Sequence, residues 1–294
     1  MRNFFSYWTR KQSDVLRCKI LEALGFDYDR SLTPYENFLK LPEPDLNGSI
    51  VPQSLLQARA LFSKDEDMLS PIDREKVALD SFIASEESCS LVNETVRDGS
   101  ITKGDAGIIL YYDQCTIATL LGSVPTLEEL PLTFGPGATS TCRRKTSARW
   151  KMSSPLSISN SCLNILPDLR TALPALFRAH ENDVRVTLGE LEFVPKNFKT
   201  HRAIVIEPTL NTMVQRGIGT FLKRKLYRNI NLSDQSINRN RAHEGSRNGT
   251  YCTVDLERAS DSIPYLLVME LLPIDWFQLL DSVRTPAVRH KATN

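Results

Sequence analysis

The spacing of apolar residues predicts a largely helical N-terminal half. A helix over residues 11–25, ended by Gly25, is predicted by apolar residues every three or four positions, at Val15, Leu16, Ile20, Leu21 and Leu24. The same spacing predicts helices over residues 53–63, 73–93 and 108–121. Between them, residues 31–52, rich in Pro, Asp and Asn, predict a connector with short elements, and residues 97–107 predict a polar turn region.

The pattern changes in the second half of the chain. Residues 134–160 are rich in Ser and Thr and predict loops, whereas Val184–Val194 alternates well enough to predict a strand that pairs with His201–Ile206. The clearest helix is predicted over Leu210–Leu226, where seven apolar residues form one stripe. Tyr251–Val254 then predicts a short strand that ends at Asp255, and helical spacing resumes at Ile263. Helices together with few strands predict an α/β (α+β) fold.

Composition places this pattern in an ordinary globular protein. Of 294 residues, 41% are hydrophobic and 24% are charged, and no apolar run is long enough to cross a bilayer. The six cysteines include no Cys-x-x-Cys pair, which argues against a zinc ribbon. We therefore expect a protein without a secretory or membrane-spanning segment.

The net charge of +1 conceals a strong asymmetry along the chain. Residues 64–98 carry 10 acidic and 4 basic side chains, whereas residues 195–249 carry 11 Lys and Arg against 3 acids. Residues 131–166 hold five cations and no acid, at Arg143, Arg144, Lys145, Arg149 and Lys151. A solvated helix face can produce one such run, but two separate basic regions favour a surface for a polyanion.

Two carboxylates follow the predicted strand at Tyr251–Val254. Asp255 stands at its end and Asp261 lies six residues further on. Phosphoryl transfer uses divalent cations held by hard oxygen ligands, and a strand end fixes such a ligand well. Alternatively, Asp255 is the N-cap of the next helix and Asp261 is a solvated acid of its first turn.

A second candidate is the Pro-Lys-Asn-Phe-Lys-Thr stretch, which predicts a turn between two extended runs. It presents Lys196, Lys199 and Arg202, three cations that suit a triphosphate. The alternative is a hairpin tip with solvated cations.

Three further features each have two interpretations. The Gly135-Pro136-Gly137 loop either presents amides to an anion or positions the basic run behind it. The stretch from Asp234 to Asn238 either contacts RNA or a nucleotide ribose, or forms a capped turn. Cations near the end of the 210–226 helix suit RNA, but the helix dipole also favours them there, at Lys223, Arg224, Lys225 and Arg228.

These segments, in this order, resemble the RNA-directed RNA polymerase (replicase β subunit) of levivirus-type single-stranded RNA bacteriophages. The resemblance continues through Gln215–Gly219, Leu232–Asn238, Glu244–Ser246 and Ala259–Ser262, and ends with Leu271–Trp276 and Leu279–Pro286. Earlier, Phe134–Ser140 resembles a loop of the fingers in that family. The close resemblance covers about residues 190–286, and a looser one reaches back to about residue 130.

The resemblance implies a right-hand polymerase with palm and fingers. Residues 1–130 would form a mostly helical part of the fingers, residues 131–249 the fingers with the nucleotide-binding turn, and residues 250–294 the beginning of the palm. It implies template-directed RNA synthesis from ribonucleoside triphosphates in the cytoplasm of the infected bacterial host, with RNA template and product and host translation elongation factors as partners.

The resemblance also implies roles for single residues. Asp255, assisted by the Leu256 carbonyl, would bind Mg²⁺ or Mn²⁺ in a two-metal site, and either Ser260 or Asp261 would sense the ribose 2′-hydroxyl. Lys196, Lys199 and Arg202 would hold the nucleotide. RNA would contact the basic residues of the loop and of the helix, Arg143, Arg144, Lys145, Lys223, Arg224, Lys225 and Arg228.

One departure from the family pattern is plain. A complete member would continue to a Gly-Asp-Asp turn with further metal ligands, and this sequence has no Asp-Asp pair. We therefore expect the front part of a replicase, inactive by itself. The alternative is a non-catalytic RNA-binding product of a truncated replicase gene.

Overall fold

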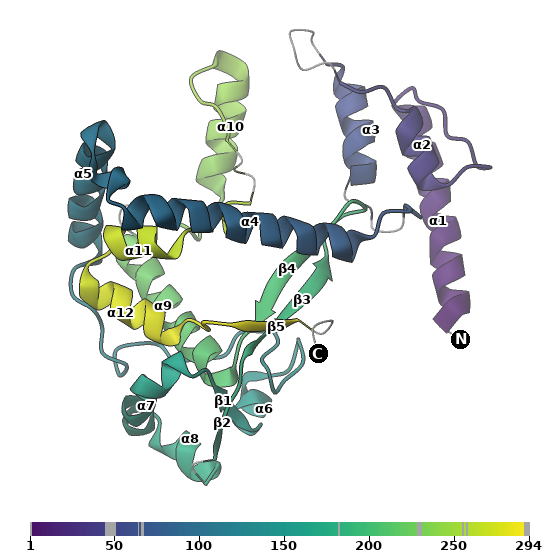
Figure 1. Cartoon of the computed structure of the whole chain (residues 1–294). Helices are drawn as coiled ribbons and strands as arrows, with labels where there is room; N and C mark the ends of the chain where they lie inside the picture. Colours follow the sequence, from purple (N-terminus) through teal and green to yellow (C-terminus); the bar gives the residue numbers. More distant parts are fainter. Residues whose placement is uncertain are drawn as a thin grey trace. The chain divides into compact units, whose positions relative to one another are not determined.

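The computed structural model describes residues 2–44, 51–63, 65, 68–181, 183–227, 231–254, 256 and 258–290, with side chains from residue 13 onward. Figure 1 shows the helices and strands. The chain forms two compact units, one made of Met1–Phe82 and Phe193–Ile204, the other of Ile83–Glu192 and Val205–Asn294. It passes from the second unit to the first within strand β3 (Gly189–Pro195) and returns within β4 (His201–Ile206).

The first unit is built on short helices. It contains α1 (Arg2–Ala23), α2 (Pro34–Lys40), α3 (Gln53–Ser63) and the beginning of α4 (Arg74–Arg97). Helix α2 starts with a capping box, in which the Thr33 hydroxyl accepts the Glu36 amide and the Glu36 carboxylate accepts the Thr33 amide. These reciprocal bonds satisfy amides that a short helix otherwise leaves without partners.

Aromatic rings fill the core of this unit. Phe38 of α2 packs edge-to-face on Phe62 of α3 and on Phe198, with ring centroids 5.9 and 5.1 Å apart. Phe198 comes from the turn between β3 and β4 and is buried, with only 1% of its surface exposed. Such ring pairs stabilise the contact by about 0.5–1.5 kcal/mol beyond their buried area. A residue more than 130 positions away in sequence therefore completes the core of the N-terminal helices.

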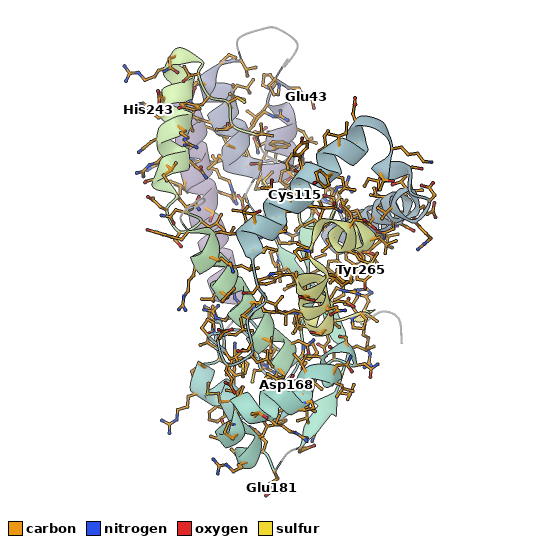
Figure 2. The ribbon with its side chains drawn as sticks, turned by 90° about the vertical axis from the view of Figure 1, so that its left-hand side faces the viewer. Glu43, Cys115, Asp168, Glu181, His243 and Tyr265 are labelled. Carbon is orange, nitrogen blue, oxygen red and sulfur yellow. The ribbon has the colours of Figure 1, made fainter. Side chains whose placement is uncertain are left out.

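The second unit combines helices with small sheets. In addition to the remainder of α4, it contains a 3₁₀ turn η1 (Ser100–Thr102), α5 (Gly104–Leu121), α6 (Ala148–Met152), β1 (Leu156–Ile158), a second 3₁₀ turn η2 (Ser161–Ile165), α7 (Leu166–Ala172), α8 (Pro174–Ala179), β2 (Val184–Val186), α9 (Thr209–Leu226), α10 (Ser236–Asn248), α11 (Tyr265–Leu271), α12 (Ile274–Val283) and β5 (Val288–His290). Figure 2 shows α5 and α11 side by side, near the labelled Cys115 and Tyr265.

Helix α9 lies at the centre of this unit. Its buried apolar residues pack in one cluster with β1, the η2–α8 segment and α12, through Leu210, Met213, Val214, Ile218, Leu156, Ile158, Leu169, Phe177 and Trp276. Gly217 allows close packing, because a Cβ there would lie 3.1 Å from Leu132 Cδ2 and 3.3 Å from Leu130 Cβ. The Trp276 indole is buried and donates to the Gly122 carbonyl. The apolar stripe predicted for residues 210–226 is therefore a core-facing stripe.

The strands form two separate sheets. Strands β1 and β2 pair in parallel, with Ser157 opposite Arg185, and the second sheet has the order β4-β3-β5, with β5 parallel to β3. The single strand predicted over Val184–Val194 is wrong: it is divided into β2 and β3, which belong to different sheets. Alternation reports which side chains share a face, but it does not reveal which neighbour a strand pairs with. The pairing of this region with His201–Ile206 is confirmed for β3.

The helix predictions agree with the structure apart from their ends. The helix over residues 53–63 has the predicted bounds, and α4 and α5 begin or end up to four residues away from the expectation, whereas α1 begins at Arg2, nine residues before the predicted start. Gly25 follows α1 with a φ of 84°, a conformation that glycine adopts readily. No helix in the described residues is long and apolar enough to cross a membrane.

Candidate nucleic-acid interface

The cationic turn between β3 and β4 belongs to the first unit. The Asn197 side chain accepts the amides of Lys199 and Thr200, each at 2.9 Å, which is the geometry of an Asx turn. Phe198 inserts into the aromatic core, whereas Lys196, Lys199 and Arg202 are exposed. The turn predicted here is confirmed, and the rigid core on one side of it holds its backbone in place.

A pocket of 410 Å³ lies beside this turn, within the first unit. Its lining includes the rings of Tyr35, Phe38 and Phe198, together with Arg59 and Lys199. The Arg59 guanidinium stacks over Phe38 at 4.8 Å and donates to the carbonyls of residues 41 and 42. This pocket could not be predicted from the sequence, because the residues that form it are far apart along the chain.

The Gly135-Pro136-Gly137 loop of the second unit closes around a buried lysine. The Lys151 ammonium donates to the carbonyls of Gly135 and Gly137 and is fully buried. Burial lowers its pKa from the usual lysine value. The loop carbonyls therefore point inward, which favours the interpretation that the loop positions the basic run rather than cradling an anion.

The basic run follows directly from this loop. Lys145 donates its amide to the Pro136 carbonyl and adopts a φ of 67°, and Arg143, Arg144 and Lys145 are all exposed. The expectation that Lys151 belongs to the same cationic surface is wrong, because its side chain is buried against the loop.

A buried polar network joins this loop to α9. We define the α9 polar network as Ser157, Ser159, Thr209 and Asn211, each with at most 1% of its surface exposed. Helix α9 starts after Pro208, which has no side-chain oxygen to offer, and the Ser157 hydroxyl accepts the Thr209 amide at 2.8 Å instead. A residue of β1 thus caps a helix that begins 52 positions later.

Two loop hydroxyls extend the network to the basic run. Ser140 Oγ lies 2.6 Å from Ser157 Oγ, and Thr141 Oγ1 lies 2.8 Å from Thr209 Oγ1. Asn211 accepts the Ser159 amide and donates to the Val283 carbonyl, which Gln215 also contacts at 2.9 Å. The start of α9 therefore fixes the loop, β1 and the end of α12 together.

Glu207, just before α9, is a largely buried acid beside this network. Its carboxylate accepts the Thr285 hydroxyl, and its backbone carbonyl accepts the Ser140 amide. Burial raises the pKa of Glu207 above its usual value, although hydrogen bonds from Thr285 and Gln215 act in the opposite direction. Glu207 was not among the predicted site residues, since the burial of one acid within a basic region cannot be inferred from its sequence context.

The segment around Asp255 differs from the expectation. Residues 250–254 form no strand, so that prediction is wrong, whereas the helix predicted after it is confirmed as α11, which begins at Tyr265, two residues after Ile263. A strand needs the hydrogen bonds of a neighbouring strand, and none lies beside residues 250–254 in the described part of the chain. Asp255 lies outside the described residues.

Helix α10 holds the beginning of this segment. A Cβ on Gly245 would lie 2.2 Å from the Tyr251 carbonyl oxygen, so only glycine permits the approach. Gly249 ends α10 in a left-handed conformation and donates its amide to Gly245. Further on, Leu256 is exposed, and exposed Ser260 donates to the Asp261 carboxylate at 2.9 Å.

The remaining predicted RNA-binding residues lie on α9 or between α9 and α10. Lys223 and Arg224 are exposed, whereas Lys225 is half-buried with its ammonium over the Phe221 ring at 5.4 Å. Arg228 lies outside the described residues. The Asp234 carboxylate accepts the Ser236 amide at 2.9 Å, which favours the capped-turn interpretation of that stretch.

Within the second unit, these elements form an α+β framework with cations on the 143–145 loop and on the C-terminal half of α9; the 196–202 turn belongs to the first unit. No group of three or more His, Cys, Asp or Glu side chains that could hold a metal occurs among the described residues. The chain belongs to the family of RNA replicase beta-chains, whose model matches residues 20–290.

Curated relatives agree with this family. The chain is 35% identical over 243 residues to the RNA-directed RNA polymerase subunit beta of Escherichia virus Qbeta, covering 78% of this chain and 40% of the relative. It is 35% identical over 278 residues to that of Enterobacteria phage SP, covering 90% and 47%. It is 43% identical over 105 residues to the beta chain of Escherichia phage MS2, covering 35% and 19%. The chain thus spans less than half the length of these relatives.

Glu207 makes stability depend on pH in a predictable direction. At a pH between the usual glutamate pKa of 4.5 and the raised pKa of Glu207, the native carboxyl group keeps a proton that the unfolded state has lost. The free energy of unfolding should therefore fall as pH rises through this window. Glu207→Gln should remove that slope, measured by denaturant unfolding at a series of pH values, whereas Glu128→Gln, at an exposed glutamate of the same unit, should leave it unchanged. An unaltered slope in Glu207→Gln would contradict the burial of this carboxyl group.

Proposed function

We propose that this chain is part of an enzyme that synthesises RNA on an RNA template by adding ribonucleotides to a growing 3′ end. The match of the RNA replicase beta-chain family to residues 20–290 carries the proposal. In this account the architecture is a palm with fingers. Residues 1–130 and 131–249 contribute to the fingers, and residues 250–294 begin the palm.

The turn at residues 196–202 would bind the incoming ribonucleoside triphosphate. Its three cations are exposed, while Phe198 and Asn197 fix the backbone that carries them. A preorganised cation needs little rearrangement when charge develops on the leaving phosphates, so it stabilises the transition state more than a mobile one. Ser260 or Asp261 would contact the ribose 2′-hydroxyl, for which a hydroxyl and a carboxylate are both suitable partners.

Asp255, with the Leu256 carbonyl, would contribute ligands to a site for Mg²⁺ or Mn²⁺. Carboxylate and carbonyl oxygens are the donors these ions prefer. Asp255 lies outside the described residues, and among the residues that are described no group of three or more His, Cys, Asp or Glu side chains could hold a metal ion. A bound ion would supply charge stabilisation to phosphoryl transfer.

RNA would follow the exposed cations of the loop and of α9. Arg143, Arg144 and Lys145 stand on the loop that Lys151 closes, and α9 carries Lys223 and Arg224, with Lys225 and Arg228 in the same run of sequence. Arg and Lys side chains bind phosphates without reading sequence. As a replicase part, the protein would act in the cytoplasm of the infected bacterium, with host translation elongation factors as partners.

The two cationic regions should respond differently to substitution. In a complete replicase that contains this segment, Lys199→Ala or Arg202→Ala should raise the apparent nucleotide KM and lower kcat, with kcat/KM reduced about tenfold. Lys223→Ala or Arg224→Ala should instead weaken RNA binding and reduce its salt slope by about 1. Steady-state primer extension measures the nucleotide KM and kcat, and RNA titrations at several salt concentrations measure RNA affinity and its salt slope. Identical behaviour of all four variants would refute the division between a nucleotide site and an RNA surface.

The catalytic assignment is tested at Asp255. Asp255→Asn in the same complete replicase should abolish primer extension in Mg²⁺ or Mn²⁺ while thermal unfolding stays near that of the parent, because an amide is a poor ligand for a hard cation. Asp275→Asn makes the same chemical change at an exposed position of α12 and should leave extension nearly unchanged. Normal extension by Asp255→Asn would remove Asp255 from the active site.

A further inference from the structure

A hydroxyl-lined groove of 410 Å³ lies within the second unit. The polar side of its lining includes Ser140, Thr141, Ser157 and Thr187. Two of these hydroxyls, on Ser140 and Ser157, lie 2.6 Å apart and belong to the structure that caps α9. The wall of the groove is therefore held rigidly by the core of the unit.

Charged side chains come into the groove from both small sheets. Arg185 of β2 stands opposite Ser157 of β1, and Arg289 of β5 stands opposite Glu190 of β3. Arg185 is 68% exposed and lies 4.0 Å from the Asp183 carboxylate, so this ion pair is loose. A guanidinium presents a planar fork of donors that fits two phosphate oxygens. The groove thus offers two phosphate-binding groups and one carboxylate.

One hydroxyl in the lining lacks a partner. Thr187 Oγ1 is buried and makes no hydrogen bond with any described residue, although the Thr187 amide donates to the Ile158 carbonyl at 2.9 Å. A buried hydroxyl without a partner costs about 1–3 kcal/mol. Since Thr187 is a lining residue of the groove, a small shift of the surrounding side chains would let a ligand hydroxyl or another polar group reach this oxygen.

The chemistry of the lining distinguishes among ligands. None of the described lining residues is aromatic, so the groove provides no surface on which a base would stack. Guanidinium groups suit the phosphate, and Thr187 with Glu190 suits a ribose 2′-hydroxyl, which both donates and accepts hydrogen bonds. The groove therefore matches the backbone of RNA more closely than a base or a DNA strand.

We propose that this groove binds the ribose-phosphate backbone of single-stranded RNA, with Arg185 and Arg289 on phosphates and Thr187 and Glu190 on a 2′-hydroxyl. The site is separate from the cations on the 143–145 loop and on α9. It rests on the proposed function only in taking RNA as the polyanion, and it discriminates RNA from DNA without reading sequence.

The test is the binding of a fluorescent oligoribonucleotide, and of its 2′-deoxy counterpart, to the 294-residue chain, measured by anisotropy at several salt concentrations. Arg185→Ala and Arg289→Ala should each weaken RNA binding about tenfold and reduce the salt slope by about 1. Arg178→Ala, which removes the same charge from an exposed position on α8 outside the groove, should change neither quantity by as much.

Thr187→Val tests ribose recognition with a side chain of the same shape. It should reduce the preference for RNA over DNA several-fold, leave DNA binding unchanged, and keep or raise the melting temperature because an unpaired hydroxyl is removed. Equal losses on RNA and DNA would overturn the ribose contact. Equal effects of Arg185→Ala and Arg178→Ala would overturn the groove as a binding site.

Three further outcomes are decisive. Competition by ATP as strong as that by the oligoribonucleotide would mean a free-nucleotide site and would overturn the strand proposal. If the groove variants bind RNA normally while Lys223→Ala does not, the groove proposal fails and the replicase function stands. If the unsubstituted chain binds no RNA, the groove proposal fails, whereas primer extension by a complete replicase still decides the proposed function.

Discussion

The second unit depends on the hydrogen bonds at the start of α9. The helix begins after Pro208, and its first amide is accepted by Ser157 from β1. Asn211, two residues further on, joins β1 to the last residue of α12. Buried polar groups are costly unless they are paired, so these bonds allow one arrangement of the three segments and disfavour others. The apolar face of α9 then packs into the core cluster of this unit through Leu210, Met213, Val214 and Ile218.

The hydrogen bonds at the start of α9 position one set of cations, and the aromatic core of the first unit positions another. In the second unit, the α9 polar network and the buried Lys151 fix the loop that carries Arg143–Lys145. In the first unit, Phe198 completes an aromatic core and thereby fixes the turn that carries Lys199. Each unit thus places cations on a rigid base, and a preorganised cation binds phosphate at a lower entropic cost than one on a mobile loop.

Local patterns predicted the helices better than the sheets or the site. Residues 53–63 form a helix with the predicted bounds, because apolar spacing and the flanking residues define a helix locally. The run Val184–Val194 was predicted as one strand and is two, since strand pairing depends on distant partners. Lys151 and Glu207 were indistinguishable from surface residues, because their burial arises from segments elsewhere in the chain. The cations at residues 143–145, 199 and 223 lie exposed, as their sequence context indicated.

The most direct test of this account is residue-level hydrogen exchange, compared between the unsubstituted chain and the Asn211→Leu variant. This substitution keeps much of the side-chain volume but removes the hydrogen bonds of the Asn211 amide group. Amides of residues 156–159, 209–215 and 283–285 should lose protection together and by similar amounts, while those of α3 keep theirs. Loss of protection limited to residues next to position 211 would show that the α9 polar network does not hold β1, α9 and the end of α12 as one unit.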